Sequence, residues 1–404
     1  MSALKHASVS SFEPLIPSDT GIEKSRLPEL ALELERQAAA LSGKLSPVTA
    51  IVLEEHMRVI NSYYSNLIEG NSTLPQDIRK AMNGEYSSDP SKRDLQLESL
   101  AHIKVQRELS KGNTPPLLSA DCFSQIHRLF YEELPDTLRI VKGSHEETKL
   151  VTPGQFRQQD EEVEVGRHLP PTADDLSLFL NRFATAYKLE QHHGQKRVIA
   201  AMAAHHRFMW VHPFLDGNGR VGRLHTDLFL KAIGIGACGI WCLSRGLARN
   251  HHEYKAALAR ADFPRQGDRD GRGALSESHL IGFCEFMLTT AIDQVSFMDQ
   301  LLDLHGMGQR IQHYIDDRNK GLIGGMGPIK PEAVRLLEKA FIYGEFPRAD
   351  MDKISGLSNS VTRKLVRQLK EEGLLTETSS RSPLRWAIPE HAERFYLPEL
   401  APTR

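Results

Sequence analysis

A segment rich in glycine and arginine, His-Pro-Phe-Leu-Asp-Gly-Asn-Gly-Arg-Val-Gly-Arg at 212–223, constrains this chain more than any other feature. Its glycines open positive-φ conformations and let backbone N–H groups converge on an anion. Its arginines carry planar, permanently charged forks that suit phosphate oxygens. Asp216 offers a hard oxygen ligand for Mg²⁺, and His212 is the side chain able to exchange a proton near neutral pH. The segment therefore predicts a site of phosphate transfer.

The residues around this segment exclude two other glycine-rich motifs. Residues 217–222 satisfy GxGxxG, but that pattern marks a dinucleotide site only between a strand and a helix. The preceding residues 198–211 carry apolar side chains and alanines at a spacing that favours a buried helix. No acidic residue follows within 228–250 to bind a ribose, and Arg223-Leu224 stands where a Walker A motif has Lys-Ser/Thr. The segment is therefore neither a Rossmann motif nor a P-loop.

The same twelve residues match every fixed position of the signature His-x-Phe-x-(Asp/Glu)-Gly-Asn-Gly-Arg-x-x-Arg, so the chain resembles the Fic family. The resemblance implies a mostly helical fold and the transfer of AMP from ATP to a hydroxyl side chain of a target protein. It also implies that His212 is the general base for that hydroxyl. Asp216 would hold Mg²⁺ against the α and β phosphates.

The resemblance also implies which residues bind the phosphates. Asn218 and the backbone N–H groups around Gly217 and Gly219 would form an anion hole. Arg220 and Arg223 would hold the outer phosphates. The helix that begins near Gly219 would add the positive end of its dipole to this cradle. Phosphoryl transfer asks mainly for such positioning and charge stabilisation.

A second segment, Ser-Asn-Leu-Ile-Glu-Gly-Asn at 65–71, fits the inhibitory motif (Ser/Thr)-x-x-x-Glu-(Gly/Asn) that many Fic proteins carry. Ser65 and Glu69 are four residues apart and share one face of a helix, which apolar spacing predicts over about 47–68. Gly70 and the next residue form a typical helix stop. The resemblance implies that Glu69 pairs with Arg223 in the place of the γ-phosphate, so that ATP binds only unproductively.

A third segment, 153–171, predicts a β-hairpin because Val163, Glu164 and Val165 alternate in the manner of a strand after polar turn residues. Its position is similar to that of the hairpin flap of Fic proteins. The resemblance implies that Val163 to Gly166 border the nucleotide and that the flap holds an extended target by strand pairing. A surface hairpin without this role fits the alternation equally well.

Composition sets the remaining expectations. A net charge of −2 predicts no bulk attraction to nucleic acid or to anionic membranes, and no apolar run approaches the roughly 20 residues that span a bilayer. The first residues show no apolar core of a signal peptide. The four cysteines, at 122, 238, 242 and 284, fit no metal spacing and favour a reducing cytoplasm. The histidines near 212 lack the carboxylate partners of a zinc site.

We expect an all-α chain of several domains. Residues 1–112 form a helical region with the inhibitory helix at about 47–70. Residues 113–320 form the catalytic core with its small hairpin flap, and a glycine-rich hinge then leads into a domain at 321–404. A loosely docked or disordered arm is expected up to about residue 27. Helices are expected at 28–41, 47–68, 92–109, 120–131, 173–190, 196–211, 219–233, 250–261 and 275–317.

The C-terminal part resembles a winged helix-turn-helix domain, which often accompanies Fic cores. Its predicted order is helix, turn, helix and two-stranded wing, at 331–343, 348–354, 360–372, 373–378 and 385–388. Ser358 to Arg363 are residue types that contact phosphates and base edges. However, residues 330–404 hold 13 basic and 11 acidic residues, a net charge of +2, whereas DNA binders show a stronger basic face. Protein docking or dimerisation is therefore favoured over DNA binding.

The family resemblance implies a protein adenylyltransferase that uses ATP and Mg²⁺ and is inhibited in cis through Glu69, and the cysteine usage predicts a cytoplasmic location. Its substrate would be a Tyr, Thr or Ser hydroxyl of a target protein or of the chain itself. Two alternatives lie within the enzyme class: removal of AMP, and transfer of another phosphate-containing group. A third lies outside it: a transcription regulator whose Fic-like part senses a nucleotide.

Overall fold

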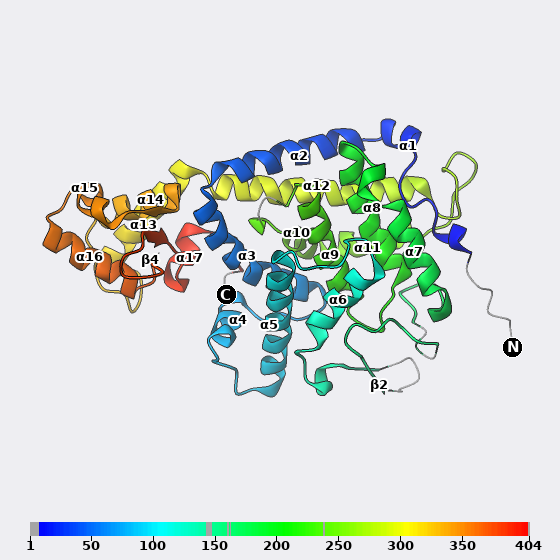
Figure 1. Cartoon of the computed structure of the whole chain (residues 1–404), viewed down its shortest axis with the longest axis horizontal. Coiled ribbons are helices and arrows are strands. Elements are labelled where there is room, and N and C mark those ends of the chain that lie inside the picture. The colour runs from blue at the N-terminus through cyan, green and yellow to red at the C-terminus, as the bar shows by residue number, and fades with distance from the viewer. Residues whose placement is uncertain (1–7, 143–147, 160, 162, 237–238, 403–404) are drawn as a thin grey trace. The chain divides into compact units, whose positions relative to one another are not determined.

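The computed structural model describes residues 8–142, 148–159, 161, 163–236 and 239–402, and it is mainly helical (Figure 1). The chain divides into two compact units. Unit 1 comprises Met1–Gln37, Asn61–Gly236 and Cys242–Gln294, and unit 2 comprises Ala38–Ile60, Ala237–Trp241 and Val295–Arg404. Three long helices contribute residues to both units: α2 (Leu27–Lys44), α3 (Pro47–Ile68) and α12 (Glu277–Leu301).

Unit 1 surrounds one buried helix, α8 (Gln195–Val211), in which every residue from 198 to 211 except Met209 is buried. A helix that is buried all round has no solvated face, and the buried residues of α8 are mainly alanines and large apolar side chains, together with His205, His206 and Arg207. Helices α9 (Asn218–Ala232) and α7 (Leu176–Ala186) pack against it. The other helices of unit 1 are α1 (Asp19–Glu23), α4 (Pro75–Met82), α5 (Pro90–Ser110), α6 (Ala120–Tyr131), α10 (Leu243–Arg249) and α11 (His251–Ala261).

Local capping residues explain several helix ends. The predicted bounds of α3 and α6 are confirmed, and the Ser119 hydroxyl begins α6 by accepting a hydrogen bond from the Cys122 N–H (3.2 Å). The single helix predicted at 275–317 is wrong. It is divided into α12 and α13 (Leu304–Asn319), because the Asp303 carboxylate accepts from the Gly306 N–H (2.7 Å) and starts a new helix. The short helices α4 and α10 were not predicted.

The N-terminal segment, expected to be loosely docked, packs into unit 1 from Ser8 onward. Phe12 is fully buried, and the Tyr187 hydroxyl donates to the Leu15 carbonyl (2.5 Å). The buried Arg207 guanidinium donates twice to the Pro14 carbonyl, at 3.0 and 2.8 Å. Residues 1–7 lie outside the described part. The expectation is therefore wrong for the described residues of this arm, because its backbone carbonyls serve a buried arginine.

The β-hairpin prediction needs a correction. The hairpin of unit 1 is formed by β1 (Ile140–Lys142) and β2 (Thr148–Leu150), which are antiparallel and lie before the predicted segment. Within 163–171 the described residues form one isolated antiparallel bridge, Val165 to His168, around a turn in which Gly166 has φ of 64°. Two prolines, at 170 and 171, follow at once. Since proline has no N–H to donate, the bridge cannot lengthen into a ladder on that side.

The C-terminal part of unit 2 combines helices with a small sheet. After α13 come α14 (Ala333–Tyr343), β3 (Glu345–Phe346), α15 (Met351–Ser355), α16 (Asn359–Glu371), β4 (Leu375–Thr376), β5 (Leu384–Trp386) and α17 (Glu390–Tyr396). The strands form an antiparallel sheet in the order β3-β5-β4, with Leu375 opposite Trp386. The predicted pairing of the last two strands is thus confirmed. Trp386 is fully buried against Phe341 and Tyr396, at ring-centroid distances of 5.0 and 5.9 Å.

Helix α12 is long and apolar enough, by length and composition alone, to cross a membrane. Charged residues interrupt it, so it contains no uninterrupted apolar run of that length. Half of its most apolar window is buried inside the structure, and a core helix of this kind passes the same test. Its buried residues include Phe283, Met287 and Leu288. Helix α12 therefore fits a core helix, and the expected lack of a membrane partner stays a prediction.

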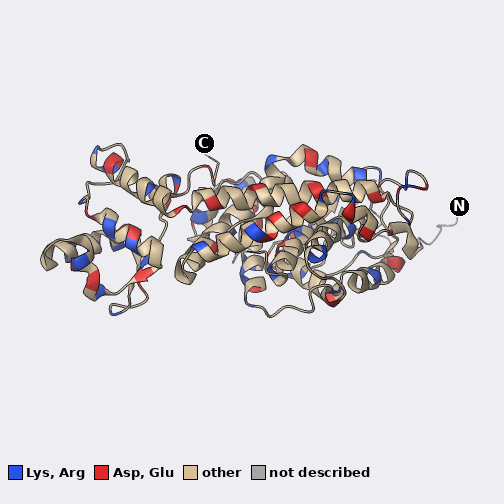
Figure 2. Ribbon diagram, turned by 90° about the horizontal axis from the view of Figure 1, so that it is seen from above, with Lys and Arg blue, Asp and Glu red and all other residues tan. Residues whose placement is uncertain are grey.

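Charge and thiols follow the expected pattern in the described residues. Figure 2 shows basic and acidic residues interspersed along the helices. The three described cysteines, Cys122, Cys242 and Cys284, are free and buried, and Cys238 lies outside the described residues. Burial raises the pKa of each described thiol to about 12, so these thiols are protonated and unreactive at neutral pH.

Candidate active site

The loop between α8 and α9 carries His212, which ends α8 in the left-handed conformation, with φ of 47° and ψ of 59°. Few residues other than glycine adopt this conformation, and such strain clusters at functional sites. Asn218 holds the loop closed: its Oδ1 accepts from the Phe214 N–H (2.9 Å) and its Nδ2 donates to the Phe214 carbonyl (2.8 Å). The Asn218 side chain, predicted in the anion hole, is thus engaged in shaping the loop.

The hydrogen bonds of His212 determine which of its nitrogens is free. Its Nδ1 lies 3.3 Å from the Met209 carbonyl, which only accepts, so Nδ1 carries the proton and Nε2 is an acceptor. Burial, with a smaller contribution from the nearby Arg157 guanidinium, lowers the pKa of His212 to about 4, against the opposing effects of the Met209 hydrogen bond and Asp216. The imidazole is therefore neutral at physiological pH. Arg157 also donates from Nε to the His212 carbonyl (2.8 Å) and keeps this turn in place.

Asp216 is supported by α6, whose role at the loop was not predicted. The Tyr131 hydroxyl donates to Asp216 Oδ2 (2.6 Å). Gly217 has φ of 80°, and a Cβ there would lie 2.7 Å from the Tyr131 ring. His127 Nδ1 accepts from the Gly154 N–H (2.8 Å), so its Nε2 carries the proton and donates to the Asp216 carbonyl (3.3 Å). The four-residue spacing of His127 and Tyr131 on one helix face was the available signal.

Asp216 fits the role of a magnesium ligand by its chemistry. Among the described residues, no group of three or more His, Cys, Asp or Glu side chains gathers as a metal site. Mg²⁺ bound with a nucleotide does not need one, because it takes one or two carboxylates and completes its shell with phosphate oxygens and water. A single carboxylate beside the first turn of α9 therefore suffices.

Glu69 and Arg223, predicted to pair, lie together. Arg223 Nη2 donates to Glu69 Oε1 (2.7 Å), and the side chains are 3% exposed for the arginine and 33% for the glutamate. Arg223 also donates to the Ser65 hydroxyl and to the Ser65 carbonyl, each at 3.0 Å. Burial pushes the pKa of Glu69 upward, but Arg223 and Arg220 outweigh it and hold the pKa below its usual value. Glu69 is therefore ionised in the pair.

The Glu69 carboxylate sits over the first turn of α9. A Cβ at Gly219 would clash with Glu69 Oε1, so the glycine makes room for this oxygen. The start of a helix presents unpaired N–H groups and the positive end of its dipole, which stabilise an anion. The carboxylate thus stands where a phosphate group would find the same partners. This contact shows that the site formed by Arg223 and the first turn of α9 can hold an anionic group.

Helix α3 is joined to α9 at a further point. Asn61 Nδ2 donates to Asp227 Oδ2 (3.1 Å), eight residues before Glu69 and on the same side of α3. Burial raises the pKa of Asp227 to about 6, although the Asn61 bond and Arg223 oppose the rise. Polar contacts therefore join α3 and α9 over two helical turns, and Glu69 lies at the end of this row.

Comparisons with known proteins show which families and folds this chain is similar to. Residues 117–230 match the model of the Fic/DOC family. This matched segment is similar to a Fic/DOC domain. It contains α6, α8 and α9 with His212, Asp216 and Arg223, whereas Ser65 and Glu69 lie before it.

Curated relatives carry the name protein adenylyltransferase Fic. That of Drosophila grimshawi is 40% identical over 172 residues, which are 43% of this chain and 32% of that protein. That of Drosophila willistoni is 37% identical over 208 residues, which are 50% of this chain and 39% of that protein. The chain thus spans about a third of the length of the curated relatives it matches.

Solved structures support the fold. A Fic family protein from Desulfovibrio desulfuricans G20 superposes with a TM-score of 0.51 at 17% identity, over 89% of this chain and 96% of that one. Residues 134–508 of Fic-1 from C. elegans give 0.51 at 14% identity, over 70% and 74% of the two chains. The predicted, mainly helical Fic fold is confirmed.

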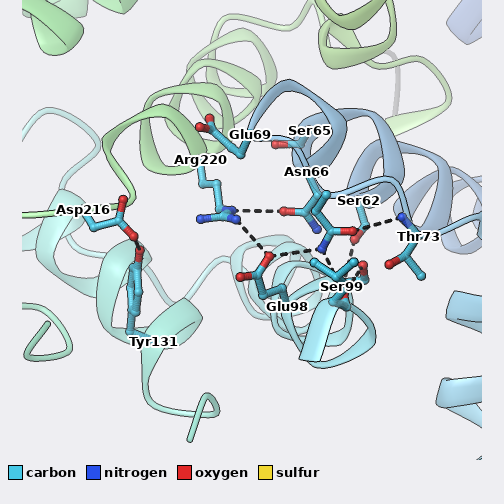
Figure 3. A network of polar contacts seen from close by, with 12 residues as sticks. Ser62, Ser65, Asn66, Glu69, Thr73, Glu98, Ser99, Tyr131, Asp216 and Arg220 are labelled. Carbon is cyan, nitrogen blue, oxygen red and sulfur yellow. Dashed lines mark hydrogen bonds and ion pairs between the residues drawn. The ribbon is translucent and has the colours of Figure 1, made fainter. Parts of the chain in front are cut away.

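Arg220, the other arginine of the Fic loop, has partners that were not predicted (Figure 3). Its Nε donates to Asn66 Oδ1 (3.1 Å) and its Nη2 to Glu98 Oε2 (3.0 Å). Its guanidinium carbon lies 4.9 Å from the centroid of the Phe130 ring. Burial works against the charge, but Glu98 and Tyr131 raise the pKa of Arg220 above its usual value. Glu98 belongs to no motif, and nothing in the sequence placed α5 beside the loop.

The predicted flap residues, Val163 to Gly166, are tied to α8 through His168, the residue that closes their turn. His168 Nε2 donates to the Trp210 carbonyl at the end of α8 (2.7 Å), and the two rings lie 4.7 Å apart. The turn itself is exposed at Glu164, Val165 and Gly166. Contact of these residues with a nucleotide stays a prediction.

Proposed function

We propose that this chain is a protein adenylyltransferase, which transfers AMP from ATP to a hydroxyl side chain of a protein. The Fic/DOC match and the name of the curated relatives support this assignment. The observation that carries it is a neutral His212, with Nε2 as acceptor, on a loop whose following helix already holds an anion, the Glu69 carboxylate. Because the chain matches only about a third of the length of these relatives, AMP transfer by the whole protein is our proposal.

In the proposed reaction, His212 Nε2 takes the proton of the target hydroxyl. The hydroxyl oxygen attacks the α-phosphorus of ATP, the bond to the β-phosphate bridging oxygen breaks, and pyrophosphate leaves. Arg220 and Arg223, with the first N–H groups of α9, stabilise the phosphate charge. Mg²⁺ held by Asp216 would neutralise further charge on the phosphates. Tyr131 orients the Asp216 carboxylate for that role.

We further propose that Glu69 inhibits the enzyme in cis. A γ-phosphate cannot use Arg223 while the Glu69 carboxylate is bound to it. Removal of the pairing carboxylate leaves the buried Arg223 uncompensated, which favours capture of a phosphate in its place. Removal of AMP is a second candidate activity, because the one-third exposed Glu69 carboxylate could activate a water at the same site.

Labelled ATP tests the proposal. Wild-type protein should incorporate little label, and the Glu69→Gly variant should label itself strongly from ATP carrying ³²P at the α-phosphate. The matched control is ATP labelled at the γ-phosphate, which should label neither protein. Equal α-labelling of the two proteins would remove Glu69 from the inhibitory role. Incorporation of γ-label would instead identify phosphate transfer and refute AMP transfer.

Two alternatives have weaker support. Transfer of a different phosphate-containing group is disfavoured, because Asp216, Asn218 and Arg223 of the ATP-type signature are all present. A transcription regulator that senses a nucleotide would bind genomic DNA fragments in a manner that depends on ATP. A gel mobility shift with and without ATP separates this regulator from the enzyme.

For the C-terminal part we propose a winged helix domain that docks a target protein or a second copy of the chain. The order of α14, α15 and α16 followed by the paired strands β4 and β5 supports this assignment. The near-neutral charge of 330–404 argues against dedicated DNA binding. We also propose a cytoplasmic location, which the free thiols of the described cysteines support.

A further inference from the structure

The two arginines of the Fic loop are held in different ways. Arg223 is bound by Ser65 and Glu69, both on α3. Arg220 is bound by Asn66 on α3 and also by Glu98, which lies on α5. A movement that withdraws the Glu69 carboxylate therefore frees Arg223 from its ion pair. The ion pair of Arg220 does not depend on Glu69.

Glu98 is itself fixed in place. Its Oε2 accepts from Arg220 Nη2 (3.0 Å) and from Asn71 Nδ2 (3.1 Å). Asn71 Nδ2 also donates to the Leu95 carbonyl (3.0 Å), one turn earlier on α5. The Glu98 side chain is 18% exposed and that of Arg220 10%. Because the pair is shielded from water and its acceptor is held by a second donor, the orientation of the guanidinium is well determined.

These contacts leave one edge of Arg220 for a ligand. Glu98 and Asn66 use Nη2 and Nε, and the Phe130 ring contacts the guanidinium. Figure 3 shows the remaining nitrogen on the side that faces Asp216 and Tyr131, away from the helices that bind the other two. The free edge thus points toward the side of the loop that carries the predicted metal ligand.

We infer that Glu98 is a positioning residue, which holds Arg220 with its free edge toward the phosphates of ATP. The inference rests on the proposed function and extends it to a residue outside the Fic/DOC match. A preoriented guanidinium binds phosphate without first losing its rotational freedom, so nucleotide affinity depends on its support. Without the carboxylate, the arginine keeps its charge but loses its fixed direction.

Nucleotide binding measured by calorimetry tests this role without requiring catalysis. In the Glu69→Gly background, Glu98→Gln should raise the dissociation constant of Mg-ATP about tenfold, as expected for the loss of one charge-assisted hydrogen bond. Adenosine, which has no phosphate, should bind as before. The matched control is Glu108→Gln, which removes a carboxylate paired with Lys111 (2.7 Å) on the same helix and should change neither constant.

Kinetics supply a second readout that a merely structural role would not produce. We expect Glu98→Gln to raise KM for ATP about tenfold while kcat stays within about threefold, since the base and the metal ligand are untouched. Asn71→Ala removes one of the two donors to Glu98 and should shift ATP affinity in the same direction by a smaller factor. This variant also keeps the test decisive if Glu98→Gln does not fold.

Two results would overturn the inference. One is unchanged ATP affinity in both the Glu98→Gln and Asn71→Ala variants. The other is equal weakening of ATP and adenosine, which would make Glu98 a general support of the fold. If the binding pattern holds but no AMP transfer occurs, the proposed function fails and the positioning role stands. If transfer occurs and ATP affinity is unchanged, the positioning role fails alone.

Discussion

The two arginines in the first two turns of α9 and the three exposed basic residues of α16 differ in burial and in their ion pairs. On α9, Arg220 is 9% exposed and Arg223 is 3% exposed, and each has a carboxylate partner. On α16, Arg363, Lys364 and Arg367 are exposed. The sequence around both helices predicted phosphate contacts. Arg220 and Arg223 are held in fixed directions by their carboxylate partners, whereas on α16 the ion pair of Lys370 with Glu377 (2.6 Å) lies at the other end of the helix from the exposed Arg363 and Lys364.

This difference separates a binding site from a charged surface. An arginine cannot lose its proton when buried, so it must be paired, and its partners orient it. An exposed basic side chain is solvated and screened by salt, and it keeps its rotational freedom. We therefore expect changes on the α8–α9 loop to alter chemistry strongly. Changes on the exposed face of α16 should alter association weakly.

The largest expected effect is on catalysis by His212. In the Glu69→Gly background, His212→Ala should lower the rate of AMP transfer by roughly 10²–10⁴, the usual contribution of a general base. The ATP dissociation constant should change little, because the imidazole acts on the target hydroxyl. Both quantities can be measured on the same preparation. Transfer at the parental rate would refute the assignment of His212 as the base.

The next effect concerns Asp216. Asp216→Asn, which keeps the size of the side chain but removes its charge, should reduce transfer by about 10² and raise the Mg²⁺ concentration needed for half-maximal rate. Tyr131→Phe leaves the carboxylate in place without its hydrogen bond and should give a smaller shift in the same direction. Full activity in excess chelator would contradict a role for a divalent ion.

Buried histidines in unit 1 should make the protein sensitive to acid. Burial lowers the pKa of His225 to about 4, against an unfolded value of about 6.5, so the unfolded chain binds more protons between these values. The contribution of neutral His225 to the free energy of unfolding is therefore fully present above about pH 6.5 and is lost as the pH falls toward 4. At pH 5 the loss from this residue is about 2 kcal/mol.

Chemical unfolding at pH 7.5 and pH 5 measures the effect. His225→Gln retains a donor for the Leu117 carbonyl (2.9 Å in the wild type) and cannot titrate. The difference in unfolding free energy between the two pH values should therefore shrink by about 2 kcal/mol in the variant. An unchanged difference would show that His225 does not contribute to the acid sensitivity.

The smallest effect is expected on α16. Arg363→Ala together with Lys364→Ala should leave self-modification by the Glu69→Gly protein unchanged and should alter the oligomeric state or the choice of target. Unfolding free energy should change by less than about 0.5 kcal/mol, because both side chains are exposed. The opposite result would be tight, sequence-selective DNA binding at physiological salt that the two substitutions abolish. It would show that the exposed residues of α16 form a binding site, and it would favour the alternative of a transcription regulator.

The sequence by itself determined the features that depend on neighbouring residues. The spacing of glycines at 217, 219 and 222 indicated the turn and the start of α9. The bounds of α3 and α6 followed from apolar spacing and, for α3, from the helix stop at Gly70. These features could be predicted because backbone preferences and helical spacing act within a few residues. The pairing of Glu69 with Arg223, 154 positions apart, was implied by the family resemblance of the motif at 65–71 and not by local spacing.

Only the tertiary structure decided which distant side chains complete the site. Tyr131 reaches Asp216 across 85 positions of sequence, and Glu98 reaches Arg220 across 122. The tertiary structure was also needed to settle one local detail, namely that the isolated bridge at Val165 does not extend into a strand. The physical reason is that a buried charged side chain pairs with whichever oppositely charged or hydrogen-bonding group lies near it in space. That position depends on how α5, α6 and α9 pack together, which no local pattern of residues records.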